Sequence, residues 1–479
     1  MSDAQSLSVK RAEVEFHKFA SLGEPDRAIR IYAEENQRRR GLILKHLDFI
    51  GPMSPFLEIG ANAGHSSYML ANEFDAHGFA LDLSADALRY GAVLQDVWKL
   101  ARAPVRIAGD ALNLPFRDGS LRLVMAYQML SQFMDIGSVF REVERVLAPG
   151  GVFLFAEEPL KRLLSLGLYR CPYYEEMKPW ERRLHGWGLL GYLVKDVIGA
   201  AQEEGFGIRQ NHSMDLKRWH RLIGEHFADQ RYDVFAQERG WGETVVGRLA
   251  RWRRPRGSVW TVARLLGGTL AAVCRKDGEP PETGSWTERF ESLLRCPDCH
   301  GPLVRGGDDT LECACGYRAP NEGGVYNLLP STEKRELYPG DRADIVDFSV
   351  PGHEKALLDG WHAVEGVFGN KYRWIGPRAG LKLTPLAATP CRLRIRGHAS
   401  ELGFQQGQPV RVEALVNGRR VGHWTLDRTG LFVLEADLAA APEYRVEILA
   451  SPSWQSPPDD RVLTVNLSLI RLEPADGEK

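Results

Sequence analysis

The sequence predicts an α/β fold for residues 1–277, followed by a small cysteine module and an all-β sandwich. Three observations lead to this prediction. Strand and helix patterns alternate between residues 51 and 160, as they do in parallel sheets covered by helices. Four cysteines gather between residues 296 and 315. From about residue 350 onward, short alternating strands follow one another without helical periodicity between them.

Length and composition bound the possible functions. A chain of 479 residues is long enough for about three domains, and 44% hydrophobic residues can build well-formed cores. A formal net charge of −2 argues against a surface that binds nucleic acid globally, though a local basic patch is compatible with it. The polar N-terminus lacks a signal-peptide pattern, and no apolar run reaches the ~18 residues of a membrane span. We therefore expect a cytoplasmic protein.

The first strand of the α/β part ends in a glycine turn. Residues 1–50 have helical spacing of apolar residues, and we expect them to form a lid or brace against the sheet. The string FLEIGANAG at 56–64 then reads as a buried strand, in which Gly60 and Gly64 permit a tight turn before a helix. Asp82 ends the next apolar run. Strand, glycine turn, helix, strand and acid are the order in which α/β folds bind adenosyl ligands, with the acid on the ribose hydroxyls.

Further landmarks follow in order. Asp110 stands in AGDALNLPF after the third strand, LRLVMAYQML reads as the fourth strand, and FREVERVLAPGGVFLFAEE gives a helix, a turn and the fifth strand. Residues 40–160 resemble class I S-adenosylmethionine-dependent methyltransferases of the ubiquinone-biosynthesis type (methyltransferase type 11). That resemblance implies a Rossmann-like sheet of seven strands and S-adenosylmethionine as the cofactor. The residues it implies for the cofactor are Glu58, Gly60, Ala61, Gly64, Asp82, Leu83, Asp110, Ala111 and Tyr127.

Two positions depart from the family pattern. Asn62 stands where the middle glycine is usual, which bears on how the turn approaches the methionine part of the ligand. Arg122 stands where a strand-four aspartate is common, and we expect it to be structural. The outer glycines are present.

Residues 161–230 are rich in aromatic residues and histidines and show no strand pattern. In the resembled family, an insertion here commonly covers the active site and selects the substrate. A helical packing layer is the alternative, and one cap can do both. RYDVFAQERG and GGTLAAVCRK read as the last two strands, and GEPPETGSW as a linker after Asp277.

The cysteine module at 291–330 has metal-ligand spacing. Cys296 and Cys299 lie on one turn and Cys313 and Cys315 on another, so that four thiolates can surround one tetrahedral zinc. An iron–sulfur cluster and a metal-free loop are the alternatives, but ~40 residues with few large apolar side chains fold poorly without a metal. The module resembles zinc ribbons that accompany methyltransferases, including ribosomal RNA guanine-N1 methyltransferases. In those RNA enzymes the ribbon precedes the catalytic domain, whereas here it follows. We read the remaining cysteines as packed thiols.

The expected sandwich spans residues 345–475, with Asn417–Gly418 as a hairpin signal. The strings KYRWIGPRAGLKL and DDRVLTVNLSLIRLE within it resemble β-sandwich modules appended to bacterial glycosyltransferases and methyltransferases of polysaccharide clusters. Its tryptophans could stack on sugar rings or serve as core residues: Trp361, Trp374, Trp424 and Trp454. The basic run at 248–257 could meet a phosphate or RNA, although a solvated loop is the commoner role of such a run.

Methyl transfer is an in-line displacement that depends on positioning, and a general base helps where the acceptor is a hydroxyl. Glu158, at the end of the fifth strand, and His212, in the insertion, are the candidate catalytic residues. Three functions remain open. The first is a methyltransferase that O-methylates a sugar-containing or other small-molecule acceptor in cell-surface polysaccharide biosynthesis. The others are a ribosomal RNA methyltransferase that uses the ribbon and a non-catalytic scaffold. The near-neutral charge and the sandwich favour the first.

Overall fold

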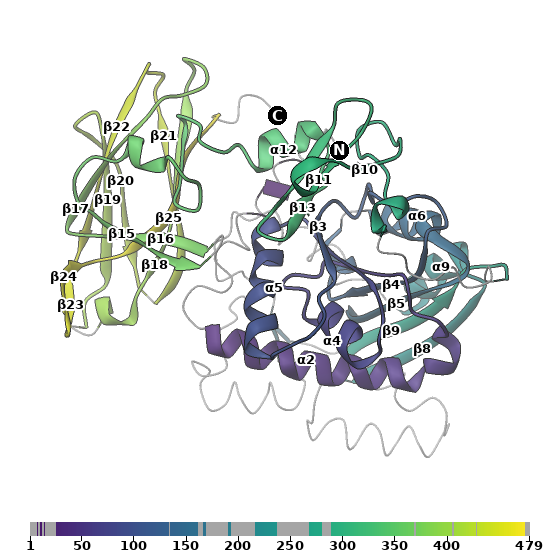
Figure 1. Cartoon of the computed structure of the whole chain (residues 1–479). Helices are drawn as coiled ribbons and strands as arrows, with labels where there is room; N and C mark the ends of the chain where they lie inside the picture. The colour runs from purple at the N-terminus through teal and green to yellow at the C-terminus, as the bar shows by residue number, and fades with distance from the viewer. Residues whose placement is uncertain are drawn as a thin grey trace. The chain divides into compact units, whose positions relative to one another are not determined.

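The structure is a computed structural model of the whole chain (Figure 1). It describes residues 7, 10, 11, 14, 25–133, 135–160, 166–168, 190–192, 216–236, 268–279, 289–367, 370–404, 407–427 and 429–474. The chain divides into two compact units. The first comprises Met1–His17, Glu24–Asp196 and Ala200–Leu337, and the second is built mainly from Tyr338–Lys479.

The first unit is built on a mixed sheet of eleven strands in the order β10-β11-β12-β13-β3-β2-β1-β4-β5-β9-β8. Its α/β part consists of β3 (Val105–Ala108), β2 (Gly78–Asp82), β1 (Phe56–Ile59), β4 (Leu121–Tyr127), β5 (Leu147–Leu160), β9 (Gly268–Arg275) and β8 (Asp229–Ala236). Strands β3 to β5 run parallel, and β9 is antiparallel to both of its neighbours. β1, β2 and β4 are buried along their whole length, as in sheets covered on both faces. The predicted Rossmann-like mixed sheet is present, and strands β10 to β13 of the cysteine module extend it.

Helices cover the sheet, with α2, in purple, lying against α4 (Figure 1). The helices of this part are α2 (Pro25–Lys45), α3 (Leu47–Ile50), α4 (His65–Glu73), α5 (Ala85–Val97), η1 (Leu130–Gln132) and α6 (Ile136–Val146). Their starts follow local chemistry. Ser84 caps α5 by accepting from the Ala87 N–H, and Asp135 caps α6 by accepting from the Ser138 N–H. The two caps therefore set where α5 and α6 begin.

Part of the predicted insertion at 161–230 is described. Two short strands pair in parallel, β6 (Leu166–Leu168) with β7 (Leu190–Tyr192), although no strand pattern was expected there. Helix α9 (Leu216–His226) packs against the core, where Trp219 is 1% exposed and lies 5.5 Å from the ring of Phe155. This packing is what a helical layer against the sheet requires, and it leaves the role of the rest of the insertion a prediction. His212 and the basic run at 248–257 lie outside the described residues.

The cysteine module extends the same sheet. Its strands are β10 (Val304–Arg305), β11 (Thr310–Glu312), β12 (Arg318–Glu322) and β13 (Val325–Asn327), preceded by η3 (Phe290–Leu293), interrupted by η4 (Gly307–Asp309) and followed by α12 (Ser331–Leu337). β13 runs parallel to β3, with Tyr326 opposite Ile107, and Figure 1 shows the two side by side. Without β13, strand β3 would be an edge with unpaired backbone groups. The module expected at 291–330 is therefore joined to the α/β sheet by backbone hydrogen bonds.

The second unit is a β-sandwich. One sheet runs β15-β16-β25-β18-β21, with β14 beside β25, and the other runs β17-β22-β19-β20. The strands are β14 (Ile345–Asp347), β15 (Trp361–Val367), β16 (Asn370–Ile375), β17 (Arg378–Leu383), β18 (Cys391–Ala399), β19 (Val410–Val416), β20 (Arg419–Leu426), β21 (Gly430–Leu438), β22 (Tyr444–Ser451), β23 (Trp454–Ser456), β24 (Asp459–Leu463) and β25 (Asn466–Pro474), with η5 (His353–Ala356) and η6 (Glu401–Phe404) between them. Leu393, Val412 and Ile470 belong to one core that both sheets share. Alternating burial along β19 and β22 produces it.

The hairpin predicted at Asn417 and Gly418 is present. Asn417 and Gly418 join β19 to β20 with φ of 51° and 78°, as a tight hairpin requires. Trp361 donates its indole N–H to the Gly380 carbonyl at 2.6 Å, which is a structural role. Trp374 and Trp454 are half-buried and meet edge to face, with ring centroids 5.3 Å apart. No helix among the described residues is long and apolar enough to cross a bilayer.

Candidate functional site

Three non-glycine residues with left-handed backbone conformations lie at adjacent strand ends. Asn62 follows β1, Gln128 follows β4 and Glu157 stands near the end of β5, with φ of 51°, 53° and 66°. Such conformations cost about 1–3 kcal/mol for most residues and gather at functional sites. β1, β4 and β5 are neighbours in the sheet, so the three residues mark its carboxyl edge. Ligands of open α/β sheets bind at this edge.

The glycine turn is shaped for a close approach. Gly60 and Gly64 have φ of 66° and 75°. A Cβ on Gly60 would come within 2.8 Å of the Met129 side chain, and one on Gly64 within 3.3 Å of the Ala80 Cβ. Both positions therefore require glycine. Ala61, between them, donates its N–H to the Leu81 carbonyl at 3.0 Å and ties the turn to β2.

Asp82 joins the turn to the end of β2. Its Oδ2 accepts from the Asn62 N–H at 2.8 Å, and its Oδ1 accepts from the Ser84 N–H at 2.9 Å. Asn62, the departure from the family pattern, thus uses its backbone to hold the acid. Each carboxylate oxygen keeps a further lone pair for a ligand hydroxyl. Leu83, next in the chain, is buried at the same edge.

Asp110 lies at the neighbouring strand end. Its Oδ1 accepts from the Leu112 N–H at 2.9 Å, and its Oδ2 lies 2.8 Å from the Lys10 Nζ. Ala111 is buried beside it. The Gly109 N–H donates to the Asp82 carbonyl at 2.9 Å, so the ends of β2 and β3 are held together. Asp82 and Asp110 therefore lie at the same edge of the sheet.

Other predicted residues face inward. Glu58 is 1% exposed, and its Oε2 accepts from the Ser67 N–H at 2.8 Å and the Ser67 hydroxyl at 2.6 Å. Burial raises its pKa, while the charges of His65 and Arg39 oppose the rise. Tyr127 directs its hydroxyl toward the Met125 sulfur at 3.6 Å. Both side chains therefore bond to other protein groups in the interior and do not face the sheet edge. Arg122, predicted to be structural, is buried within β4.

The Glu158 carboxylate is buried and accepts three backbone hydrogen bonds. It accepts from the backbone N–H groups of Met129, Leu130 and Ser131 at 2.9, 2.8 and 3.0 Å, and the residue is 0% exposed. Burial raises its pKa, and the N–H donors oppose the rise. A group so enclosed anchors η1 to β5 and has no route to an acceptor. The geometry therefore argues against the catalytic role predicted for Glu158.

Glu157 faces the site instead. Its side chain is 17% exposed, and its Oε2 accepts from the Gln128 amide at 3.1 Å and from Arg39 Nη2 at 2.9 Å. Its Oε1 is 3.8 Å from Arg38 Nε. The pairing of β5 with β9 shifts register between Phe155 and Glu158, which turns Glu157 outward.

A charged cluster from α2 covers this end of the site. Arg39 is 5% exposed, lies 4.3 Å from the Tyr127 ring centroid and places Nη1 2.6 Å from His65 Nε2. Burial lowers its pKa, but Glu157 and Glu35 outweigh burial and raise it. Glu35 Oε2 lies 2.9 Å from the same His65 nitrogen. Sequence reasoning missed this cluster, because α2 reads as an ordinary amphipathic helix.

Two buried nitrogens of the cluster lack a protein partner. His65 Nδ1 and Arg39 Nε make no hydrogen bond with any described residue. The His65 ring stacks on Tyr32, with ring centroids 4.5 Å apart. Unsatisfied buried polar atoms beside a glycine turn fit a polar ligand group or ordered water.

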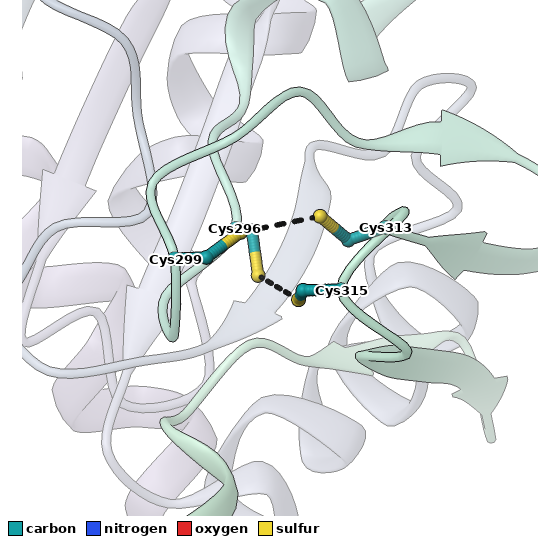
Figure 2. A group of neighbouring side chains, drawn as sticks. All are labelled: Cys296, Cys299, Cys313 and Cys315. Carbon is teal, nitrogen blue, oxygen red and sulfur yellow. Dashed lines mark hydrogen bonds between the residues drawn. The ribbon is translucent and has the colours of Figure 1, made fainter.

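The four cysteines of the module converge (Figure 2). All four sulfurs lie within 4.8 Å of one another, with Cys296 and Cys315 at 3.7 Å and Cys299 and Cys313 at 3.4 Å. Zinc–sulfur bonds of about 2.3 Å at tetrahedral angles place thiolates about 3.8 Å apart. The donor set therefore fits one tetrahedral zinc ion. Cys274 and Cys391 are buried elsewhere, as packed thiols.

Part of the chain is similar to known methyltransferases. Residues 57–155 match the family model described as a methyltransferase domain. The chain is 31% identical over 134 residues to malonyl-acyl-carrier-protein O-methyltransferase of Dechloromonas aromatica, covering 27% of this chain and 47% of that one. It is 33% identical over 108 residues to demethylmenaquinone methyltransferase of Corynebacterium urealyticum, covering 22% and 43%. The chain thus spans less than half the length of these relatives.

A solved structure of phosphoethanolamine N-methyltransferase 2 from Haemonchus contortus, in complex with S-adenosyl-L-methionine, is 17% identical. The match covers 50% of this chain and 53% of that one, with a TM-score of 0.31.

Proposed function

We propose that the protein is an S-adenosylmethionine-dependent methyltransferase. The observation that carries the proposal is the Asp82 carboxylate, held by the Asn62 N–H beside a turn whose two glycines have positive φ. The methyltransferase-domain match over residues 57–155 supports it. The non-catalytic scaffold is disfavoured because Asp82 and Asp110 occupy the predicted strand ends.

The residues fit an adenosyl ligand laid across the ends of β1, β2 and β3. The Gly60–Gly64 turn would allow close approach, Asp82 would accept from the ribose hydroxyls, and Asp110 lies one strand further along. When bound, the cofactor supplies an electrophilic methyl group. The chain contributes binding, orientation and exclusion of water, through α2 above the turn.

We propose Glu157 as the residue that accepts a proton from the acceptor hydroxyl. It stands at the carboxyl edge of the sheet, and its Oε1 has only the distant Arg38 nearby among the described residues. Arg39, bonded to the other oxygen, fixes the orientation of the carboxylate. A base so placed fits general-base chemistry. His212 remains a candidate from the insertion.

We propose a sugar-containing or other small-molecule acceptor, methylated on oxygen, in cytoplasmic steps of cell-surface polysaccharide biosynthesis. The β-sandwich, with half-buried Trp374 and Trp454 side by side, and the near-neutral net charge of −2 support this proposal. The alternative acceptor is ribosomal RNA, with the ribbon as the recognition element. In that case the affinity of the protein for ribosomal RNA would fall steeply as the salt concentration rises.

Labelled methyl transfer separates these acceptors. The full chain should label glycan or nucleotide-sugar fractions and leave ribosomal RNA unlabelled. Labelled RNA with unlabelled glycan would establish the alternative. If titration calorimetry shows no binding of S-adenosylmethionine or S-adenosylhomocysteine, the methyltransferase proposal itself fails.

We also propose one structural zinc ion per chain, held by Cys296, Cys299, Cys313 and Cys315. The sulfur separations support it, and four thiolates leave no open position for water. Elemental analysis of the purified chain should find one zinc per chain, and Cys296→Ser should remove it. Iron in place of zinc, or no metal at all, would contradict this assignment.

A further inference from the structure

The turn that carries Cys296 and Cys299 contacts the loop that carries Asp110. The Asn113 amide donates to the carbonyl of Pro297, between the two cysteines, at 3.3 Å. Arg295 Nη2 donates to the Asn113 Oδ1 at 3.3 Å, and the Arg295 N–H donates to the Pro115 carbonyl at 3.1 Å. The loop from Asp110 to Pro115 is therefore bonded to the residues that surround the first cysteine pair.

A second route leads from the same turn to Asp110 through α12. Asp298 accepts from the Ser331 N–H at 2.8 Å and from the Ser331 hydroxyl at 2.5 Å, at the start of that helix. Two residues further along α12, Glu333 lies 2.5 Å from Lys10 Nζ, and the same ammonium lies 2.8 Å from Asp110 Oδ2. Lys10 thus bridges a carboxylate of the predicted ligand edge and one of the ribbon side.

Lys10 is placed to hold its charge. Burial lowers the pKa of Lys10, but the carboxylates of Asp110 and Glu333 outweigh burial and raise it. Its side chain is only 13% exposed, which limits screening of the pairs by water. Without the ammonium, two carboxylates would face each other across a half-buried gap. Lys10 therefore fixes the Asp110 carboxylate as well as neutralising it.

The backbone just before Asp110 is also held by the ribbon. The Leu328 N–H donates to the Ala108 carbonyl at 2.7 Å, where β13 ends beside β3. Backbone, side-chain amide and ionic contacts thus hold the Asp110 loop and the end of β3 before it. No other described strand pairs with this side of β3.

We infer that the cysteine turn is a positioning element of the adenosyl site, so that occupancy of the four cysteines and affinity for the adenosyl ligand are linked. The inference rests on the proposed function, because it takes Asp110 as a ligand contact. Linkage of this kind is reciprocal: a metal that tightens ligand binding is itself held more tightly when the ligand is bound. Lys10 and Asn113 are positioning residues in this scheme.

The first test is calorimetric titration of the full chain with S-adenosylhomocysteine, before and after metal removal by a chelator. We expect the stripped chain to bind about 10-fold more weakly, within the usual range of such linkage. Hydrogen exchange should increase over residues 109–116 in the stripped chain. Equal affinity and equal exchange in both forms would overturn the inference. A loaded chain that fails to bind would instead overturn the proposed function.

Two variants keep the test decisive if the stripped chain unfolds. Asn113→Ala and Lys10→Met leave the cysteines intact and cut one route each. Each should retain one metal per chain and weaken S-adenosylhomocysteine binding several-fold, and Lys10→Arg should restore most of the loss. Arg318→Ala is the matched control, because Arg318 lies in the ribbon with a 67% exposed side chain and forms its ion pair with Glu312, away from Asn113 and Lys10. It should bind normally.

The reciprocal readout separates linkage from a merely structural role. Transfer of zinc from the chain to a coloured chelator should slow when S-adenosylhomocysteine is added, and it should not slow in Asn113→Ala. Zinc release that ignores the ligand in the unmodified chain would refute the linkage, whatever the variants do.

Discussion

Replacing Glu158 with glutamine should lower the free energy of unfolding of the protein and leave methyl transfer intact. The buried carboxylate accepts three backbone N–H groups, from Met129, Leu130 and Ser131. Glutamine keeps one acceptor oxygen for the first two, but its amide nitrogen would face the Ser131 N–H as a second donor. Loss of an acceptor for one buried donor costs about 1–3 kcal/mol, and loss of the charge weakens the other two bonds by about 1 kcal/mol. We expect the free energy of unfolding to fall by about 2–4 kcal/mol.

The measurement is urea unfolding of Glu158→Gln beside the unmodified chain and Glu157→Gln, with methyl transfer assayed at a temperature where all three are folded. Glu157→Gln should unfold within about 1 kcal/mol of the unmodified chain, because its side chain is partly exposed, yet lose methyl transfer about 100-fold. Glu158→Gln should show the reverse. Unchanged stability in Glu158→Gln together with lost methyl transfer would refute the anchoring role and restore Glu158 as the base.

Three further predictions address the fold and the ligand edge. Gly64→Ala places a side chain at φ of 75° and 3.3 Å from the Ala80 Cβ, and should cost about 1–2 kcal/mol in thermal unfolding; an unchanged midpoint would contradict it. Asp82→Asn should weaken S-adenosylhomocysteine binding about 10-fold by calorimetry, with normal affinity as the opposing outcome. Burial raises the pKa of Asp233, but the hydrogen bonds it accepts from Lys45, at the end of α2, and from His46 outweigh burial and lower that pKa. The folded pKa then lies below the unfolded one, so its stabilisation is present above about pH 4 and lost below it; Asp233→Asn should flatten that acid loss in unfolding scans.

The sequence predicted those parts of the site that depend on local chemistry. A glycine turn after an apolar run, an acid at the next strand end and four cysteines at ligand spacing each constrain a few neighbouring residues. Gly60 accordingly follows β1, Asp82 ends β2, and Cys296 is one of four cysteines whose sulfurs gather. Such local signals predict structure well, because tertiary contacts rarely change which residues a backbone turn or a metal site requires.

The burial of individual charged residues and the pairing of distant strands depend on long-range packing, which the sequence did not predict. Glu157 and Glu158 are equivalent in the sequence, and only the register shift against β9 determines which of them is buried. Arg39 reads as one of three consecutive arginines on a polar helix, and its burial appears only when α2 covers the sheet edge. The pairing of β13 with β3 joins segments far apart in the chain, which no local pattern reveals.

Both covers of the candidate site come from outside residues 57–155, the segment that matches the methyltransferase family model. The family match ends at residue 155, before Glu157, and includes neither α2 nor β13. The shared segment supplies the glycine turn and both acids, which is what an adenosyl ligand needs. Arg39 and its neighbours cover one end of that edge, and the ribbon with Lys10 holds the other. We therefore propose that acceptor choice and metal dependence reside in α2 and the ribbon, outside the matched segment.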